Sequence, residues 1–127
     1  MLLRYYEIIR EMHAEHEEEF REFVERLKEK RVCVVLFGSR AEGRANLLSD
    51  YDLLVVSEEA GIEIPERLPA DIFIYSPEEC LQEIKRRNSV VLDALIKGRL
   101  IFDNLGVFEK LRRALGEEVS RYEGKQG

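Results

Sequence analysis

The sequence lacks the features that would place a protein in a membrane or direct it out of the cell. It contains no apolar stretch approaching the roughly 20 residues that a membrane-spanning helix needs. Its start, MLLRYYEIIR, lacks the uninterrupted apolar segment of a signal peptide. We therefore expect a soluble, cytoplasmic protein with no membrane partner.

Cysteine is also scarce, with Cys33 and Cys80 as its two occurrences. Cys33 lies within an apolar run, where a thiol behaves as a small buried hydrophobe, and Cys80 lies on a helical pattern. A disulfide between them is not expected in a reducing cytoplasm. The sequence also lacks the clustered cysteine and histidine spacing of a zinc site. Both cysteines are therefore expected to be structural.

Positive charge is in deficit. The chain has 20 Lys and Arg against 26 Asp and Glu, which gives a net charge of −6. Proteins that bind nucleic acid irrespective of its sequence rely on clustered Lys and Arg. This balance argues against stable nucleic-acid binding, although it does not exclude local basic contacts.

The patterns in the sequence predict a single domain of the α/β class and, within it, of the α+β type. The chain is long enough for such a domain to bury its own hydrophobic core. Apolar runs bounded by turn residues predict four strands, and apolar residues spaced by three or four predict helices. The second and third strands are joined without a helix, which favours a mixed sheet with helices packed against it. Within the single domain at 1–127, we expect a long N-terminal helix at 1–30, a core at 32–103, a C-terminal helix at 105–122 and a disordered tail at 123–127. The core is expected to contain strands at 32–37, 50–56, 71–75 and 99–103 and two helices between 76 and 98.

Acidic residues stand at the start of two of these strands. Asp50 and Asp52 share one face of the second strand, because successive side chains of a strand point to opposite sides. Two carboxylates so close together repel each other unless a proton or a cation intervenes. Mg²⁺ suits such oxygen ligands and usually binds together with substrate phosphates. Asp71, at the start of the third strand, is a candidate third carboxylate or else the cap of a turn.

The end of the first strand complements these carboxylates. Gly38 allows a sharp turn and the close approach of a ligand, and a helix starting directly after it would point free amide groups at phosphate oxygens. Ser39 adds a hydroxyl group and Arg40 a cation, and Arg44 adds a second cation or is a solvated loop residue. The spacing is not that of a P-loop, because Arg44 rather than a Lys-Ser/Thr pair follows Gly43. The stretch outlines a nucleoside triphosphate site.

This stretch resembles the signature of the DNA polymerase beta-like nucleotidyltransferase superfamily, through Gly38-Ser39, ten intervening residues, and Asp50-x-Asp52 followed by Leu-Leu-Val. In so short a chain, it looks most like the minimal nucleotidyltransferases (MNT) that are paired with HEPN proteins in prokaryotic toxin–antitoxin systems. The resemblance extends over about residues 32–103 and implies the nucleotidyltransferase fold. One departure is Glu42, which stands where many members carry a basic residue and weakens the expected hold on phosphate.

The resemblance implies an enzyme that uses ATP as substrate and one or two Mg²⁺ ions, and that transfers AMP to a hydroxyl group. The implied acceptor is a tyrosine of a partner HEPN ribonuclease toxin, which the chain would silence by protein adenylylation as the antitoxin of a hetero-oligomer. The residues to which the resemblance gives roles are, for catalysis and metal binding, Asp50, Asp52 and Asp71 and, for nucleotide binding, Gly38, Ser39, Arg40 and Arg44.

Two other interpretations stay open at this point. The chain could keep the fold and neutralise its partner by occlusion, as a non-catalytic binding module. Three converging carboxylates argue against that interpretation, because a scaffold has no need of them. The chain could also be a stand-alone enzyme that acts on a small molecule or an RNA end, and its activity would then require no partner protein.

Overall fold

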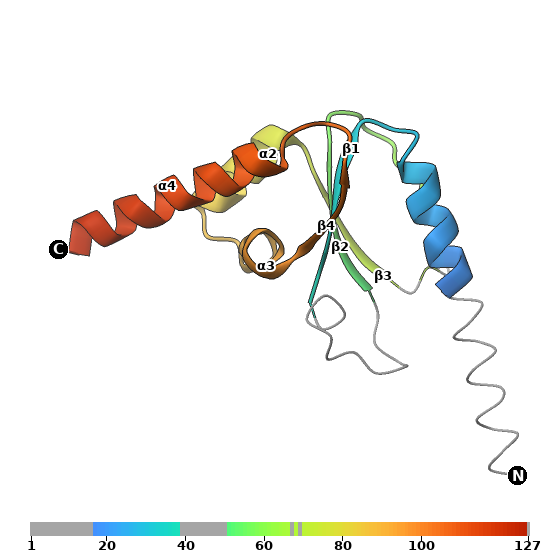
Figure 1. Cartoon of the computed structure of the whole chain (residues 1–127), viewed down its shortest axis with the longest axis horizontal. Helices are drawn as coiled ribbons and strands as arrows, with labels where there is room; N and C mark the ends of the chain where they lie inside the picture. Colours follow the sequence, from blue (N-terminus) through green and yellow to red (C-terminus); the bar gives the residue numbers. More distant parts are fainter. Residues whose placement is uncertain (1–16, 39–50, 67, 69, 127) are drawn as a thin grey trace, which may run out of the picture.

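The computed structural model describes residues 17–38, 51–66, 68 and 70–126, with side chains described as far as residue 121. None of the helices in this part of the chain combines the length and the apolar character that a membrane crossing requires. The elements, in chain order, are a helix at residues 17–27, β1 (Val32–Phe37), β2 (Tyr51–Ser57), β3 (Ala70–Tyr75), α2 (Pro77–Lys85), α3 (Ser89–Lys97), β4 (Arg99–Asp103) and α4 (Phe108–Gln126) (Figure 1).

The described strands form one sheet in the order β3-β2-β1-β4. β1 runs antiparallel to both β2 and β4, whereas β2 and β3 are parallel. The sheet is therefore mixed, which confirms the predicted α+β architecture. Figure 1 shows it edge-on between two layers, with α2, α3 and α4 on one side and the helix at 17–27 on the other.

The two central strands are buried on both faces, because helices cover both sides of the sheet. Every residue of β1 except Leu36 is buried, and so are the last five residues of β2. This burial accounts for the near-continuous apolar sequences of the two strands. Alternate side chains join two separate clusters: Val35 and Leu54 face α2–α4, whereas Val34 and Leu53 face the helix at 17–27.

The N-terminal helix differs from the long helix expected at 1–30. Within the described residues it covers 11 residues, 17–27, and residues 28–31 turn into β1. The amide of Lys30 donates to the carbonyl of Leu27 in a tight turn, and the side-chain amide of Asn104 donates to the carbonyls of Lys28 and Lys30. These contacts end the helix before residue 30. The first part of the expected helix, 1–16, lies outside the described residues.

The helices α2 and α3 lie within residues 76–98, where the sequence predicts two helices. Ser76 caps α2 in a capping box with Glu79, in which each side chain accepts a 3.0 Å hydrogen bond from the other residue's amide. Asn88 caps α3 through its side-chain oxygen, which accepts a hydrogen bond from the amide of Val90. Gly98 ends α3 so close to Val35 that an added Cβ would lie less than 3 Å from a methyl carbon of that residue. The glycine therefore allows α3 to pack directly on β1.

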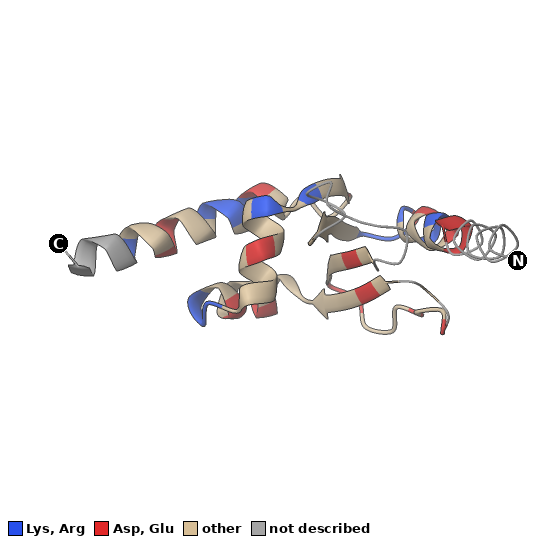
Figure 2. Cartoon of the chain, turned by 90° about the horizontal axis from the view of Figure 1, so that it is seen from below, with Lys and Arg blue, Asp and Glu red and all other residues tan. Residues whose placement is uncertain are grey.

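The C-terminal helix α4 differs from the prediction at both ends. It begins at Phe108, where the Asp103 carboxylate accepts hydrogen bonds from the amides of Gly106 and Phe108. It continues to Gln126, so the tail expected at 123–127 is helical through residue 126. Its first half packs on α2 and α3, and the helix extends beyond them in Figure 1. Figure 2 shows Lys and Arg interspersed with Asp and Glu along it.

Candidate functional site

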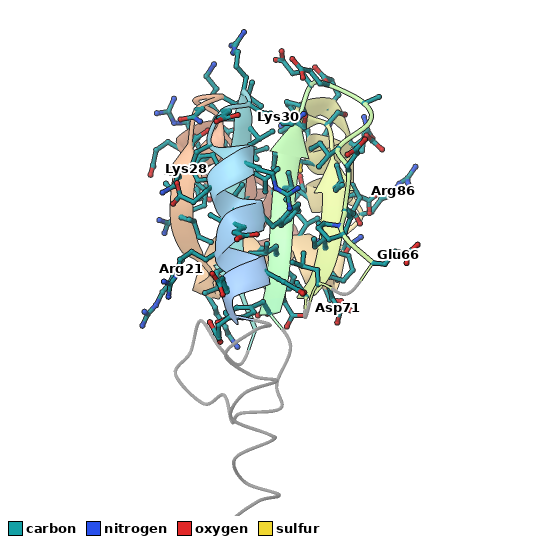
Figure 3. The ribbon with its side chains drawn as sticks, turned by 90° about the vertical axis from the view of Figure 1, so that its right-hand side faces the viewer. Arg21, Lys28, Lys30, Glu66, Asp71 and Arg86 are labelled. Atoms are coloured by element: carbon teal, nitrogen blue, oxygen red, sulfur yellow. The ribbon has the colours of Figure 1, made fainter. Side chains whose placement is uncertain are left out.

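Two of the predicted carboxylates lie opposite each other on neighbouring strands. Asp52 of β2 is the register partner of Asp71 of β3 in the parallel pair. Neighbouring strands lie about 4.8 Å apart, and paired residues point to the same side of a sheet, so one cation can reach both carboxylates. Asp52 is half-buried and Asp71 is exposed, at the lower end of β3 in Figure 3. The pair presents hard oxygen ligands at an edge that solvent and ligands can reach.

Gly38 borders this pair from the end of β1. The last residue of β1, Phe37, is the register partner of Asp52, and Gly38 follows it with a φ of 79°. Residues with a Cβ rarely adopt this conformation. A Cβ on Gly38 would lie less than 3 Å from Oδ2 of Asp52 and 3.2 Å from its Cγ. The absence of a side chain at Gly38 therefore leaves the space that the carboxylate of Asp52 occupies.

The two carboxylates project from the face of the sheet that α2, α3 and α4 cover. Phe37, Leu54 and Phe73 point to that same face and belong to its apolar cluster. The rings of Phe37 and Phe73 lie 5.9 Å apart, with an angle of 49° between their planes. The two carboxylates therefore share their face of the sheet with the apolar side chains of Phe37 and Phe73.

Tyr51, which directly precedes Asp52, points to the opposite face of the sheet. Its ring stacks on Phe20 of the helix at 17–27, with centroids 3.8 Å apart and planes 5° apart. Its hydroxyl group donates a hydrogen bond to Oε2 of Glu17. Sequence reasoning missed this contact, because the residues are far apart in the chain. The available signal was strand alternation, which sends Tyr51 to the face opposite Asp52.

The structure brings together Gly38, Asp52 and Asp71. Among the residues that it describes, no group of three or more acidic, cysteine or histidine side chains is placed to hold a metal ion. The described part of the expected metal site is thus the pair of Asp52 and Asp71. The predicted site residues that lie outside the described residues are Ser39, Arg40, Arg44 and Asp50.

The two cysteines lie fully buried in the core beneath α2–α4, and neither forms a disulfide. Burial, together with the negative charge of Asp103, raises the pKa of Cys33 far above its usual range. Burial, with the charges of Glu79 and Glu83, raises the pKa of Cys80 to about 12. Both groups are therefore neutral thiols at physiological pH, which are poor nucleophiles and poor metal ligands. The structural role expected for them agrees with this environment.

A hollow of about 200 Å³ lies on the other face of the sheet, between the helix at 17–27 and the segment 61–63. Its position separates it from the carboxylates, because it borders the start of β1 whereas Gly38 follows the end of that strand. It therefore does not belong to the site at Asp52. Its lining consists of Phe23, Arg26, Leu27, Lys30, Gly61, Ile62 and Glu63.

The chain was compared with known families, curated proteins and solved structures. The profile of a family described as "Nucleotidyltransferase domain" matches residues 17–122, which is most of the chain. No curated protein matches the sequence significantly. Among solved structures, the chain is similar to one described as "Crystal structure of the toxin-antitoxin with AMP-PNP", with a TM-score of 0.43 and 15% identity, over 87% of this chain and 89% of that one.

Proposed function

The chain belongs to the nucleotidyltransferase domain family, and we propose that it transfers AMP from ATP to a hydroxyl group. The observation that carries this proposal is the pairing of Asp52 with Asp71 beside the turn at Gly38. Nucleotidyl transfer needs carboxylates that hold a cation. Asp52 and Asp71 supply such carboxylates at this end of the sheet.

The donor chemistry of the site fits Mg²⁺. This ion prefers oxygen ligands and is usually bound by one or two carboxylates together with substrate phosphates. Asp52 and Asp71 supply two carboxylates, and we assign a further ligand to Asp50, which precedes Asp52 by two residues in the sequence. When bound, one or two Mg²⁺ ions would align the α-phosphate for attack and offset the charge on the departing pyrophosphate.

The other groups of the site would hold the triphosphate and the acceptor. We assign the β- and γ-phosphates to the backbone at Gly38, to Ser39 and to Arg40. Arg44 would add a further cation. Asp71 is the more exposed carboxylate of the pair. It would accept a hydrogen bond from the incoming hydroxyl group and take up its proton as the new bond forms.

The acceptor that we propose is a tyrosine of a partner HEPN-domain ribonuclease toxin. This step rests on the resemblance of Gly38-Ser39 and Asp50-x-Asp52 to the minimal nucleotidyltransferases. Addition of AMP near the active site of such a ribonuclease would place a bulky anionic group there and silence it. On this proposal the chain is the antitoxin of the pair and neutralises its partner by catalysis rather than by occlusion.

Transfer is tested by incubating the purified chain with Mg²⁺, ATP labelled on its α-phosphate, and a HEPN protein encoded beside it. We expect the label to move to the partner, whose mass should rise by one AMP. Asp52→Asn should abolish this transfer. Glu78→Gln is a matched control, because it also removes one carboxylate but lies in the exposed first turn of α2. This turn follows the last residue of β3, whereas Asp71 lies near the first residue of that strand.

The outcomes separate the alternatives. Transfer to a small molecule or an RNA end in the absence of the partner would show that the chain is an enzyme, but with an acceptor other than the one that we propose. Tight binding of the partner by the wild-type chain, without any transfer, would contradict the enzymatic proposal and indicate occlusion.

A further inference from the structure

The contacts of Tyr51 tie the carboxylate-bearing strand β2 to the helix at 17–27. The Tyr51 ring lies parallel to the ring of Phe20, with centroids 3.8 Å apart, and its hydroxyl group donates a hydrogen bond to Glu17. A hydrogen bond to an ionised carboxylate is roughly twice as strong as one between neutral groups. Glu17, Phe20 and Tyr51 are called the Tyr51 clamp below. Their contacts fix Tyr51, the first residue of β2, on the face of the sheet opposite to the one that carries Asp52.

The clamp lies at the margin of the core that docks the helix on the sheet, and its Phe20 packs against that core. Glu17, Phe20 and Tyr51 are each only half-buried, and they lie at the end of β2 that carries Asp52. Burial of the apolar core docks the helix on the sheet, and the contacts of Tyr51 with Phe20 and Glu17 extend this attachment to the first residue of β2. The buried core residues on this face are Phe23, Leu27, Val32, Val34, Leu53 and Val55.

The position of Asp52 depends on that strand end. Asp52 directly follows Tyr51 and is the second residue of β2. Its carboxylate has to fit against Gly38 while it faces Asp71. Chain segments with few buried contacts open locally at low free-energy cost, and a misplacement of about 1 Å can lower a catalytic rate by about 10²-fold. A contact that fixes Tyr51 therefore has a direct consequence for the geometry of Asp52.

We propose that the Tyr51 clamp positions Asp52 for metal binding and nucleotidyl transfer. Tyr51 is then a positioning residue, which acts through Asp52 and touches neither the metal nor the nucleotide. This inference rests on the proposed function, because that function gives Asp52 its role as a metal ligand. It also gives the helix at 17–27 a part in catalysis, in addition to covering one face of the sheet.

The test compares the full-length wild type with Tyr51→Phe, which removes only the hydroxyl group, and Tyr51→Leu, which also removes the stacked ring. Tyr75→Phe is the control, because it removes a tyrosine hydroxyl at the opposite end of the paired strands, where Tyr75 faces Val56. Two quantities are measured: the affinity for Mn²⁺ without nucleotide, by electron paramagnetic resonance, and the kcat and KM for ATP in AMP transfer. Thermal unfolding establishes that each variant is folded.

Residues that contact and orient the ligands of a metal ion typically contribute about 10- to 100-fold to metal affinity or activity. We therefore expect Tyr51→Leu to weaken Mn²⁺ binding and to lower kcat by about tenfold or more, with the KM for ATP nearly unchanged. Tyr51→Phe should lie between Tyr51→Leu and the wild type, and Tyr75→Phe should match the wild type. If Tyr51→Leu does not fold, Tyr51→Phe and Glu17→Gln decide the question on the same two measurements.

Wild-type Mn²⁺ affinity and kcat in a folded Tyr51→Leu protein would overturn the inference. The same result in both Tyr51→Phe and Glu17→Gln would do so if Tyr51→Leu is unfolded. A wild type that binds Mn²⁺ but transfers no AMP would contradict the proposed function alone, since the Mn²⁺ affinities of the variants still test the clamp. A wild type that binds no Mn²⁺ would overturn both.

Discussion

The carboxylate of Asp52 lies in the space beside Gly38 that a side chain on Gly38 would need. Gly38 has a φ of 79°, and a Cβ on it would come within 3 Å of Oδ2 of Asp52. Backbone conformation and available space therefore both require glycine at the turn that follows β1. Because Asp52 in turn faces Asp71, this contact controls the geometry of the proposed metal site.

The first prediction concerns Gly38→Ala. The left-handed backbone conformation costs about 1–2 kcal/mol for a residue with a Cβ, and the added methyl group displaces the Asp52 carboxylate. We expect the free energy of unfolding to fall by about that amount and the rate of AMP transfer to fall by about 10²-fold. Urea unfolding and initial rates measure the two effects.

Gly116→Ala is the matched control for this experiment. Gly116 lies in α4, where an added Cβ would meet nothing within 4 Å. Alanine is favoured over glycine in a helix by roughly 0.5–1 kcal/mol, so this variant should be slightly more stable than the wild type and equally active. Wild-type transfer by Gly38→Ala would contradict the role given to the contact with Asp52.

The second prediction concerns Gly98→Ala, in which the defect is purely one of packing. An added Cβ would lie less than 3 Å from both the carbonyl oxygen of Ala94 and a methyl carbon of Val35. Overpacking of this kind typically costs about 1–3 kcal/mol. We expect a loss of stability of that size in urea unfolding, with the Mn²⁺ affinity of the folded protein retained. Unchanged stability would show that α3 can move away from β1 without cost.

The third prediction concerns Asp71→Asn and the response to metal. Without a divalent cation the facing carboxylates of Asp52 and Asp71 repel each other, so Asp71→Asn should be at least as stable as the wild type in EDTA. Mg²⁺ with a non-hydrolysable ATP analogue should raise the unfolding temperature of the wild type, because a ligand at 100 times its Kd adds about 2.7 kcal/mol. The same addition should stabilise Asp71→Asn much less. Equal stabilisation of both proteins, measured by thermal unfolding, would exclude Asp71 from the site.

The fourth prediction concerns alkaline pH. Burial raises the pKa of Cys80 to about 12 and that of Cys33 even higher, whereas exposed thiols titrate near 9.0. Above pH 9 the unfolded chain therefore binds fewer protons than the folded chain, and stability falls as pH rises. Each thiol contributes a slope of about 0.7 kcal/mol per pH unit at pH 9, which approaches about 1.4 kcal/mol per pH unit above pH 10, and no slope well below pH 9.

Unfolding free energies at pH 8, 9 and 10 measure this slope. The variant Cys33→Ala/Cys80→Ala should start from a lower stability, because it leaves cavities in the core, but should lose less stability as the pH rises. A decline as steep as that of the wild type would show that the two thiols do not cause it.

Local signals made much of the fold predictable from the sequence. Apolar runs that end in turn residues marked the strands, and apolar residues spaced by three or four marked the helices. The end of the N-terminal helix could not be predicted, because it involves a hydrogen bond from Asn104, a residue more than 70 positions away. The last residues of α4, up to Gln126, are polar and carry no apolar spacing that would predict a helix.

The site was predictable to the extent that it is local in sequence. Gly38 was predicted as a site residue because it follows the end of the first strand. Asp52 and Asp71 were predicted because they lie at the starts of the second and third strands. The register that places Asp71 opposite Asp52 depends on the pairing of strands that a loop separates, which the sequence does not specify. The Tyr51 clamp was missed for the same reason. The roles of Ser39, Arg40, Arg44 and Asp50 stay predictions.

The most direct test of the central claim is the amount of AMP adduct formed at increasing Mg²⁺ concentration, measured by mass spectrometry of the intact partner protein. The wild type and Glu78→Gln should form the adduct in proportion to Mg²⁺ occupancy, and Asp52→Asn should form none. Adduct formation by Asp52→Asn at the wild-type rate, or formation by the wild type that does not depend on Mg²⁺, would contradict the assignment of the metal-dependent transfer site to this end of the sheet.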